Sequence, residues 1–162
     1  MDATRTDLLS EGGLGEDLRG ARLRATTPRL LVLGFLRQHQ GRHCSAEEVT
    51  AALAGSGNAL LRGSVYNVLS SLVAAGLVIV ADAGPGRTLY EASRSWHHHF
   101  VCRACGGVSD VACVAGARPC LDTELPGALV DEAQVIFRGL CPACAPNGAG
   151  LPTAYPGGQR RS

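Results

Sequence analysis

Two pairs of cysteines with the spacing Cys-x-x-Cys are the residues of this chain best suited to chemistry. Cys102 and Cys105 form the first pair, Cys141 and Cys144 form the second, and 35 residues separate the pairs. Four thiolates arranged in this way are ligands for tetrahedral Zn²⁺, whereas a single pair could equally be a redox dithiol. The gap has room for a strand–helix–strand excursion that returns the second pair to the first. The sequence therefore predicts a structural zinc site.

Three consecutive histidines precede the first cysteine pair. Side chains alternate between the two faces of a strand, so an extended segment places His97 and His99 on one face. His98 and Cys102 then lie on the opposite face. One strand can thus contribute to two sites, which predicts a second metal close to the zinc.

Composition and charge limit the classes of function. The chain has 162 residues and no lysine, and residues 18–75 carry seven arginines against two glutamates. Such a basic segment fits contact with phosphate, although a solvated surface explains it equally well. No apolar run is long enough to span a membrane, and the N-terminus lacks the features of a signal peptide. We therefore expect a cytoplasmic protein without membrane contact, in which cysteines serve metal binding or redox sensing.

The elements that position these residues follow from periodicity and from turn residues. Helices are predicted over about 29–38, 45–54 and 61–75, the second opened by a Ser45–Glu48 capping box, and strands over 77–80 and 87–91. Three helices and a β-hairpin are the element order of a winged helix-turn-helix, whose last helix enters the major groove of DNA. Short strands near 99–102, 108–111 and 134–138 and a weak helix near 123–129 follow. The expected fold is α+β, divided as a flexible segment 1–17, a winged-helix domain 18–91, an α/β domain 92–145 and a disordered tail 146–162.

Taken together, these features resemble the ferric uptake regulator (Fur) family of metal-dependent bacterial repressors. The resemblance covers roughly residues 18–145, and Cys113, Cys120 and residues 131–133 are most similar to its actinobacterial, peroxide-sensing branch of catalase repressors. It implies a homodimer with an N-terminal winged helix and a C-terminal α/β dimerisation domain. The matching segments are Thr27-Pro28-Arg29, His43-Cys44-Ser45-Ala46-Glu47, Ser64-Val65-Tyr66, Ala75-Gly76-Leu77-Val78, and the runs 97–106 and 139–144.

The resemblance also implies a regulatory metal held by both domains. Asp110 stands five residues beyond Cys105, where the peroxide-sensing branch has an aspartate. Nitrogen and oxygen ligands in five-fold geometry suit Fe(II) or Mn(II). A metal ligated from both domains would fix the angle between them and so control the affinity for DNA. The ligands implied are His43, Glu91, His97, His99 and Asp110.

The DNA contacts are expected on the helix over 61–75 and at the start of the helix over 29–38. A tyrosine ring can contact thymine methyl groups, and its hydroxyl can contact phosphate. The sequence departs from many relatives at Asn67, where they carry arginine, and this leaves the base preference open. The residues expected at the DNA are Arg29, Arg62, Ser64, Tyr66 and Asn67.

Two further cysteines, Cys113 and Cys120, bear on the response to oxidants. They could form a disulfide or sulfenate switch, or they could be small, partly buried apolar residues. The leading hypothesis is a metal-dependent transcriptional repressor that responds to peroxide and binds a palindromic AT-rich operator. An iron- or zinc-uptake regulator of the same family is the nearest alternative. A thiol–disulfide oxidoreductase is disfavoured, because the expected βαβ context around the Cys-x-x-Cys motif is absent.

Overall fold

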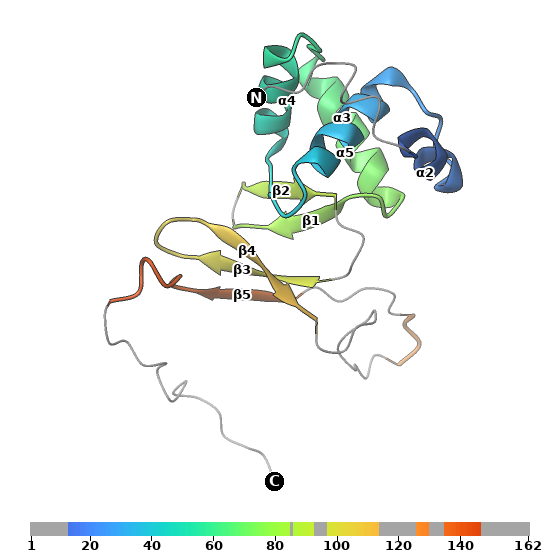
Figure 1. Cartoon of the computed structure of the whole chain (residues 1–162). Coiled ribbons are helices and arrows are strands. Elements are labelled where there is room, and N and C mark those ends of the chain that lie inside the picture. The colour runs from blue at the N-terminus through green and yellow to red at the C-terminus, as the bar shows by residue number, and fades with distance from the viewer. Residues whose placement is uncertain (1–12, 85, 93–96, 114–125, 130–134, 147–162) are drawn as a thin grey trace.

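The computed structural model describes residues 13–84, 86–92, 97–113, 126–129 and 135–146. In these residues four helices and a two-stranded sheet are followed by a three-stranded sheet (Figure 1). The helices are α2 (Leu14–Gly20), α3 (Thr27–Gln38), α4 (Ala46–Gly55) and α5 (Arg62–Ala74), and the strands are β1 (Ile79–Asp82), β2 (Thr88–Glu91), β3 (His97–Cys102), β4 (Val108–Ala112) and β5 (Ile136–Gly139).

Helices α3, α4 and α5 pack on one another around the apolar core of the N-terminal half. Leu33, Leu53 and Leu69, one from each helix, are completely buried in this core. The predicted capping box opens α4, since the Glu48 amide donates to Ser45 Oγ (3.2 Å) and the Ser45 amide donates to Glu48 Oε2 (2.7 Å). These contacts define the start of α4.

Helix α2 extends the ordered core towards the N-terminus. Leu14 and Leu18, four residues apart on one helix face, are buried in the same core as α3 and α5. Arg37 of α3 also pairs with Asp17 of α2 at 2.5 Å. The expected boundary at residue 18 therefore falls inside a packed helix, and the segment expected to be flexible includes its first turns. The Leu-x-x-x-Leu spacing is the sequence signal for this helix.

Strands β1 and β2 form the antiparallel wing hairpin, with register from Ile79 opposite Glu91 to Asp82 opposite Thr88. The first strand begins two residues later than the 77–80 prediction. The reason is that the Leu77 amide still donates to the Leu72 carbonyl (2.9 Å) at the end of α5. This register places Glu91 at the end of β2.

Cys44 adds a single residue to the wing sheet. Its amide donates to the Tyr90 carbonyl (3.0 Å), and the Tyr90 amide donates back to the Cys44 carbonyl (2.8 Å). The loop between α3 and α4 is thereby joined to β2. Because His43 precedes Cys44 and Glu91 follows Tyr90, this bridge brings the two residues of the regulatory set that lie in the N-terminal half close to each other.

In the second sheet, β3 lies between β4, which runs antiparallel to it, and β5, which runs parallel. The register pairs His99 with Asp110 on one side and Cys102 with Gly139 on the other. Two arginines connect this sheet to the wing hairpin. Arg87 Nη1 donates to the Gly106 carbonyl (2.6 Å), and Arg138 Nη2 donates to the Asp82 carbonyl (3.1 Å). The wing is thus tied to the β3–β4 turn and to the edge strand β5 of the second sheet.

The predicted α+β class is confirmed, as is the order of a winged-helix half followed by a small sheet domain with a cysteine cluster. The expected division at residue 91 falls between β2 and β3. Residues 1–12 and residues 147–162 of the expected tail lie outside the described residues. So do residues 123–125 of the weak helix expected near 123–129, whereas the described residues 126–129 begin as a turn and are not helical. None of the helices that are described is long and apolar enough to cross a membrane.

Candidate metal centres and nucleic-acid interface

The four cysteines of the two pairs converge on one point. The Sγ atoms of Cys102, Cys105, Cys141 and Cys144 all lie within 4.8 Å of one another. The Sγ atoms of Cys105 and Cys141 are 3.9 Å apart. Sulfurs bound to a tetrahedral Zn²⁺ at about 2.3 Å stand about 3.8 Å apart, so the spacing fits a zinc site.

The parallel pairing of β3 with β5 explains why cysteines so distant in sequence meet. Cys102 ends β3 opposite Gly139 of β5, and the second pair follows β5 directly. The Cys141 amide donates to Cys102 Sγ (3.3 Å), which fixes the second pair on the first. The Gly107 amide donates to Cys105 Sγ (3.4 Å) in the turn before β4. Amide donors of this kind stabilise the thiolate form that zinc binds.

The pKa values of the Cys102 and Cys144 thiols are shifted in opposite directions. The backbone amides of Cys105 and Cys141 lower the pKa of Cys102 to about 6. Hydrogen bonds to the sulfurs of Cys141 and Cys105 raise the pKa of Cys144 to about 12. Crowded sulfurs cannot all ionise unless a cation balances their charge. A divalent cation is therefore the species that this cluster fits, and four thiolates select zinc over Fe(II) or Mn(II).

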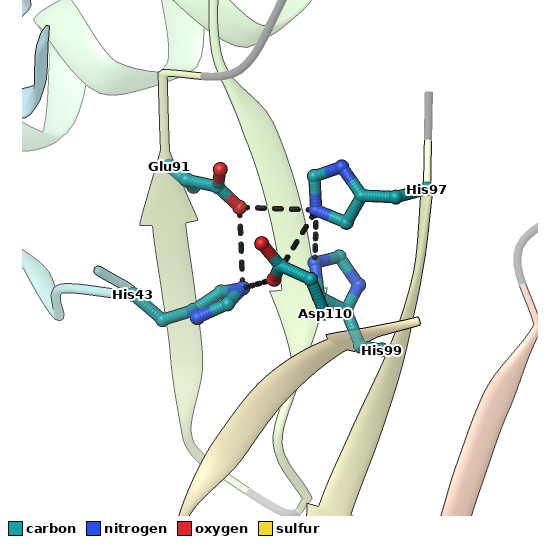
Figure 2. A network of polar contacts seen from close by, with 5 residues as sticks. All are labelled: His43, Glu91, His97, His99 and Asp110. Carbon is teal, nitrogen blue, oxygen red and sulfur yellow. Dashed lines mark hydrogen bonds and ion pairs between the residues drawn. The ribbon is translucent and has the colours of Figure 1, made fainter. Parts of the chain in front are cut away.

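The second cluster is built from nitrogen and oxygen ligands and draws on both halves of the molecule (Figure 2). His43 comes from the loop before α4, Glu91 ends β2, and Asp110 lies on β4. His97 and His99 project from the same face of β3, as the parity of the strand predicts. One ligand atom of each of the five residues lies within 4.8 Å of the others.

Distances within this cluster are short. His43 Nε2 lies 3.2 Å from Glu91 Oε2 and 3.1 Å from Asp110 Oδ1. His97 Nε2 lies 3.0 Å from the same Glu91 oxygen and 3.2 Å from His99 Nε2. Among the residues that the structure describes, the buried Nε2 of His43 has no partner in hydrogen-bond geometry, although one oxygen of Glu91 and one of Asp110 are near. Several electron-pair donors thus point into one small volume, which is the arrangement that a cation satisfies.

Burial and neighbouring side chains shift the pKa values of His99 and Glu91. Desolvation, reinforced by His43 and His97, lowers the pKa of His99 from 6.5 to about 4, which leaves this imidazole neutral. Desolvation raises the pKa of the Glu91 carboxyl, but the interactions with His43 and His97 outweigh it, so the net pKa is below its ordinary value. A neutral imidazole and an ionised carboxylate are the forms that bind metal. The donor set therefore fits Fe(II) or Mn(II).

The side chains expected at the DNA mostly lie on an exposed face of α5. Arg62, Tyr66 and Asn67 are exposed, and Ser64 is half-buried. Arg29 is half-buried as well, because its Nε donates to Ser71 Oγ (3.4 Å) and its Nη1 donates to the Arg24 carbonyl (3.1 Å). The structure thus gathers four of these residues on one helix. It ties Arg29 to the other end of that helix.

The expected thiol pair is only partly described. Cys113 follows β4 and is half-buried, whereas Cys120 lies outside the described residues. Cys44 is completely buried, and burial raises the pKa of its thiol. A thiol of this kind reacts slowly with oxidants, because the thiolate is the reactive form.

The family profile described as the ferric uptake regulator family matches residues 20–114. The chain belongs to the ferric uptake regulator family. The transcriptional regulator FurA of Mycobacterium tuberculosis is 42% identical over 132 residues, which are 80% of this chain and 88% of that protein. The ferric uptake regulation protein of Legionella pneumophila is 35% identical over 132 residues, covering 80% of this chain and 96% of the relative.

Solved structures agree with this family membership. The ferric uptake regulator of Pseudomonas aeruginosa with manganese superposes with a TM-score of 0.63 at 28% identity. The match covers 80% of this chain and 98% of that chain. The resemblance inferred from the sequence is thus confirmed, and these relatives are named as regulators rather than as enzymes.

One residue of the surface expected to contact DNA was not anticipated from the sequence. Glu47, in the first turn of α4, accepts hydrogen bonds from both Arg62 and Tyr66. In the sequence it is one of two consecutive glutamates beside a capping box. The sequence therefore assigns it only a helix-start role. No local pattern connects it to residues 15 and 19 positions further along the chain.

Proposed function

We propose that this member of the ferric uptake regulator family is a metal-dependent transcriptional repressor that responds to peroxide. The observation that carries the proposal is the second cluster, whose five ligands come from the wing, the loop before α4 and the second sheet. His43 and Glu91 belong to the DNA-binding half, whereas His97, His99 and Asp110 belong to the other half. Metal bound there favours one relative orientation of the halves, and with it one affinity for DNA.

The two metals have separate roles in this proposal. Zn²⁺ is held by the four cysteines and stabilises the second sheet, as structural zinc does in other small modules. Fe(II) or Mn(II) is held by His43, Glu91, His97, His99 and Asp110. When Fe(II) is bound, it supplies the reducing equivalents for reaction with peroxide close to the ligand imidazoles. The ligand residues hold that metal in a buried position, because His43, His97 and His99 expose little of their side chains.

The proposed partners are double-stranded DNA and a second copy of this chain. Arg62, Ser64, Tyr66 and Asn67 face an AT-rich palindromic operator, and Arg29 contacts its backbone or its minor groove. Two-fold symmetry of such an operator calls for a symmetric dimer. β5 is an edge strand among the described strands and exposes 46% of Phe137, which supports pairing with another copy. A protein that regulates transcription in this way acts in the cytoplasm of a bacterium.

Asp110 favours peroxide sensing over control of iron or zinc uptake, because the peroxide-sensing branch of the family carries an aspartate at this position. A thiol switch at Cys113 and Cys120 is a second route to the same response. The test is binding to a DNA fragment from the promoter of its own gene with Fe(II), Mn(II) or Zn(II), before and after peroxide. Peroxide should release only the Fe(II) form, with oxygen added to His43 or His97 in the mass spectrum. Equal release of the Mn(II) form with a Cys113–Cys120 link would favour the thiol route.

Binding that responds to Zn(II) or Fe(II) but survives peroxide in both forms would favour the uptake regulator. Binding without any metal requirement would contradict metal-dependent repression. Reduction of insulin disulfides at a rate above background would instead support the oxidoreductase. The DNA-binding assay and the insulin assay therefore distinguish the peroxide-responsive repressor, the uptake regulator and the oxidoreductase.

A further inference from the structure

The surface formed by α5 and the first turn of α4 holds an acidic residue among the groups proposed to contact DNA. Glu47 Oε1 accepts a hydrogen bond from Arg62 Nη2 at 2.6 Å and another from Tyr66 Oη at 2.6 Å. One oxygen atom thus receives both donors. The guanidinium of Arg62 also lies 5.6 Å from the centre of the Tyr66 ring. The three side chains form one connected group, the Glu47–Arg62–Tyr66 triad.

The triad is exposed to solvent. Arg62 and Glu47 expose 68% and 53% of their side chains, and Tyr66 is also exposed. An exposed ion pair contributes little to the stability of a fold. The capping box that starts α4 is made by Ser45 and Glu48, so Glu47 is not needed for it. Stabilisation of the fold therefore does not explain why this carboxylate lies here.

The charge balance of α5 gives the carboxylate a different role. Arg62 is the only charged residue in α5, and Glu47 pairs with it. The helix proposed to enter the major groove therefore presents almost no net charge. The sequence-independent attraction between α5 and DNA phosphates is weak, because it grows with the number of cationic side chains available to contact phosphate.

The carboxylate also orients the donors that it binds. A guanidinium has five N–H groups, and its bond to Glu47 through Nη2 leaves most of them available in a fixed plane. The Tyr66 hydroxyl is directed towards the same oxygen, and this holds its ring beside Arg62. Donors that are held in one geometry before binding discriminate between base edges better than mobile donors.

We propose that Glu47 is a positioning residue that determines specificity in this DNA-binding surface. It holds Arg62 and Tyr66 in one geometry, and its negative charge weakens their sequence-independent attraction to phosphate. The inference rests on the proposed function, because it assigns a role within DNA binding by α5. In the alternative arrangement Arg62 leaves Glu47 on binding and contacts phosphate, and the carboxylate is then a simple competitor.

The test compares two 30-bp duplexes with the full-length, zinc- and Mn(II)-loaded protein. One duplex is the sequence enriched from a random library by the wild-type protein, and the other is a scrambled duplex of equal composition. Dissociation constants are measured by fluorescence anisotropy between 50 and 200 mM KCl. The variants are Glu47→Ala, Glu47→Gln and, as a matched control, Glu48→Gln, which removes a charge from the same turn while its amide can still accept from Ser45.

With Glu47→Ala, scrambled DNA should bind more tightly, and its salt dependence should steepen by about one phosphate contact. One additional phosphate contact means that raising KCl from 50 to 200 mM weakens binding by a further factor of roughly 3.5. The ratio between selected and scrambled DNA should fall at least about fivefold, since Arg62 and Tyr66 lose their common acceptor. Glu47→Gln should steepen the salt dependence similarly but keep the ratio within about twofold, because its amide oxygen accepts the same bonds. Glu48→Gln should keep the wild-type ratio.

An unchanged ratio in Glu47→Ala, with both duplexes bound equally more tightly, would overturn the inference and identify Glu47 as a competitor of phosphate. An equal fall in the ratio for all three variants would overturn it too, because charge alone would then explain the effect. If the wild-type protein enriches no sequence and binds both duplexes alike, the proposed DNA-binding function fails instead. Thermal unfolding of each variant shows whether it is folded before these ratios are compared.

Discussion

Removal of the imidazole at His43 should separate metal binding from the integrity of the fold. His43 is the ligand contributed by the loop before α4, and its Nε2 lies 3.1–3.2 Å from the Asp110 and Glu91 oxygens. Replacement with alanine leaves four of the five ligand residues in place. We therefore expect the His43→Ala protein to fold, to keep its zinc and to bind Mn(II) weakly.

The size of the effect follows from linkage. Loss of a residue that only supports a metal ligand by hydrogen bonding lowers metal affinity about 10- to 100-fold. Loss of a ligand itself should therefore lower the affinity at least about 100-fold. At a Mn(II) concentration of about 100 times the wild-type dissociation constant, binding stabilises the wild-type protein by about 2.7 kcal/mol. At the same concentration the variant gains only about 0.4 kcal/mol. For a chain of this size these values correspond to shifts in Tm of about 5–11 °C and about 1–2 °C.

The assay is differential scanning calorimetry of the zinc-loaded protein with and without Mn(II). His39→Gln is the matched control, because His39 is a histidine of the same half that contacts the Phe35 carbonyl (2.8 Å) rather than the cluster. The control should keep the wild-type shift. A wild-type shift in His43→Ala would refute the assignment of His43, and with it the argument that metal joins the two halves.

Three further outcomes follow from the structure. Cys102→Ser should purify with less than one zinc per chain and unfold at a lower temperature, because Cys102 is central to the sulfur cluster; full zinc occupancy measured by mass spectrometry would contradict the site. Without a regulatory metal, stability should fall as the pH drops from 6.5 towards 4, because the unfolded chain protonates His99 in a range where the folded chain keeps it neutral. The depressed pKa of Glu91 acts in the same direction, and His99→Asn should flatten the unfolding profile; an equally steep profile would count against this cause. Arg87→Ala combined with Arg138→Ala should loosen the wing from the second sheet and broaden the metal-free distance distribution between spin labels on α4 and β4, whereas an unchanged distribution would deny the two contacts this role.

The cysteine site could be predicted from sequence because its information is local. Each pair fixes two ligands in one turn, so only the meeting of the pairs depends on the fold. The histidines of β3 were predictable for a similar reason, since strand parity alone puts His97 and His99 on one face. In both cases spacing along the chain determines geometry to within a few ångströms.

The joining of the two halves is not a local property. His43 reaches Glu91 because Cys44 and Tyr90 exchange two backbone hydrogen bonds across 46 positions of the chain. No periodicity encodes that bridge, and only the family resemblance pointed to His43. Glu47 illustrates the same limit, because its hydrogen bonds depend on how α4 packs against α5. Helix α2 was underestimated for a different reason, since two leucines give only a weak helical signal among glycines and charges.

We propose that the two faces of β3 serve two different metals. Anomalous diffraction from crystals of the protein loaded with Zn(II) and Mn(II), recorded at the absorption edge of each metal, tests it most directly. We predict a zinc peak among Cys102, Cys105, Cys141 and Cys144, and a manganese peak among His43, Glu91, His97, His99 and Asp110. A manganese peak elsewhere, or a nitrogen and oxygen cluster that stays empty at saturating Mn(II), would contradict it.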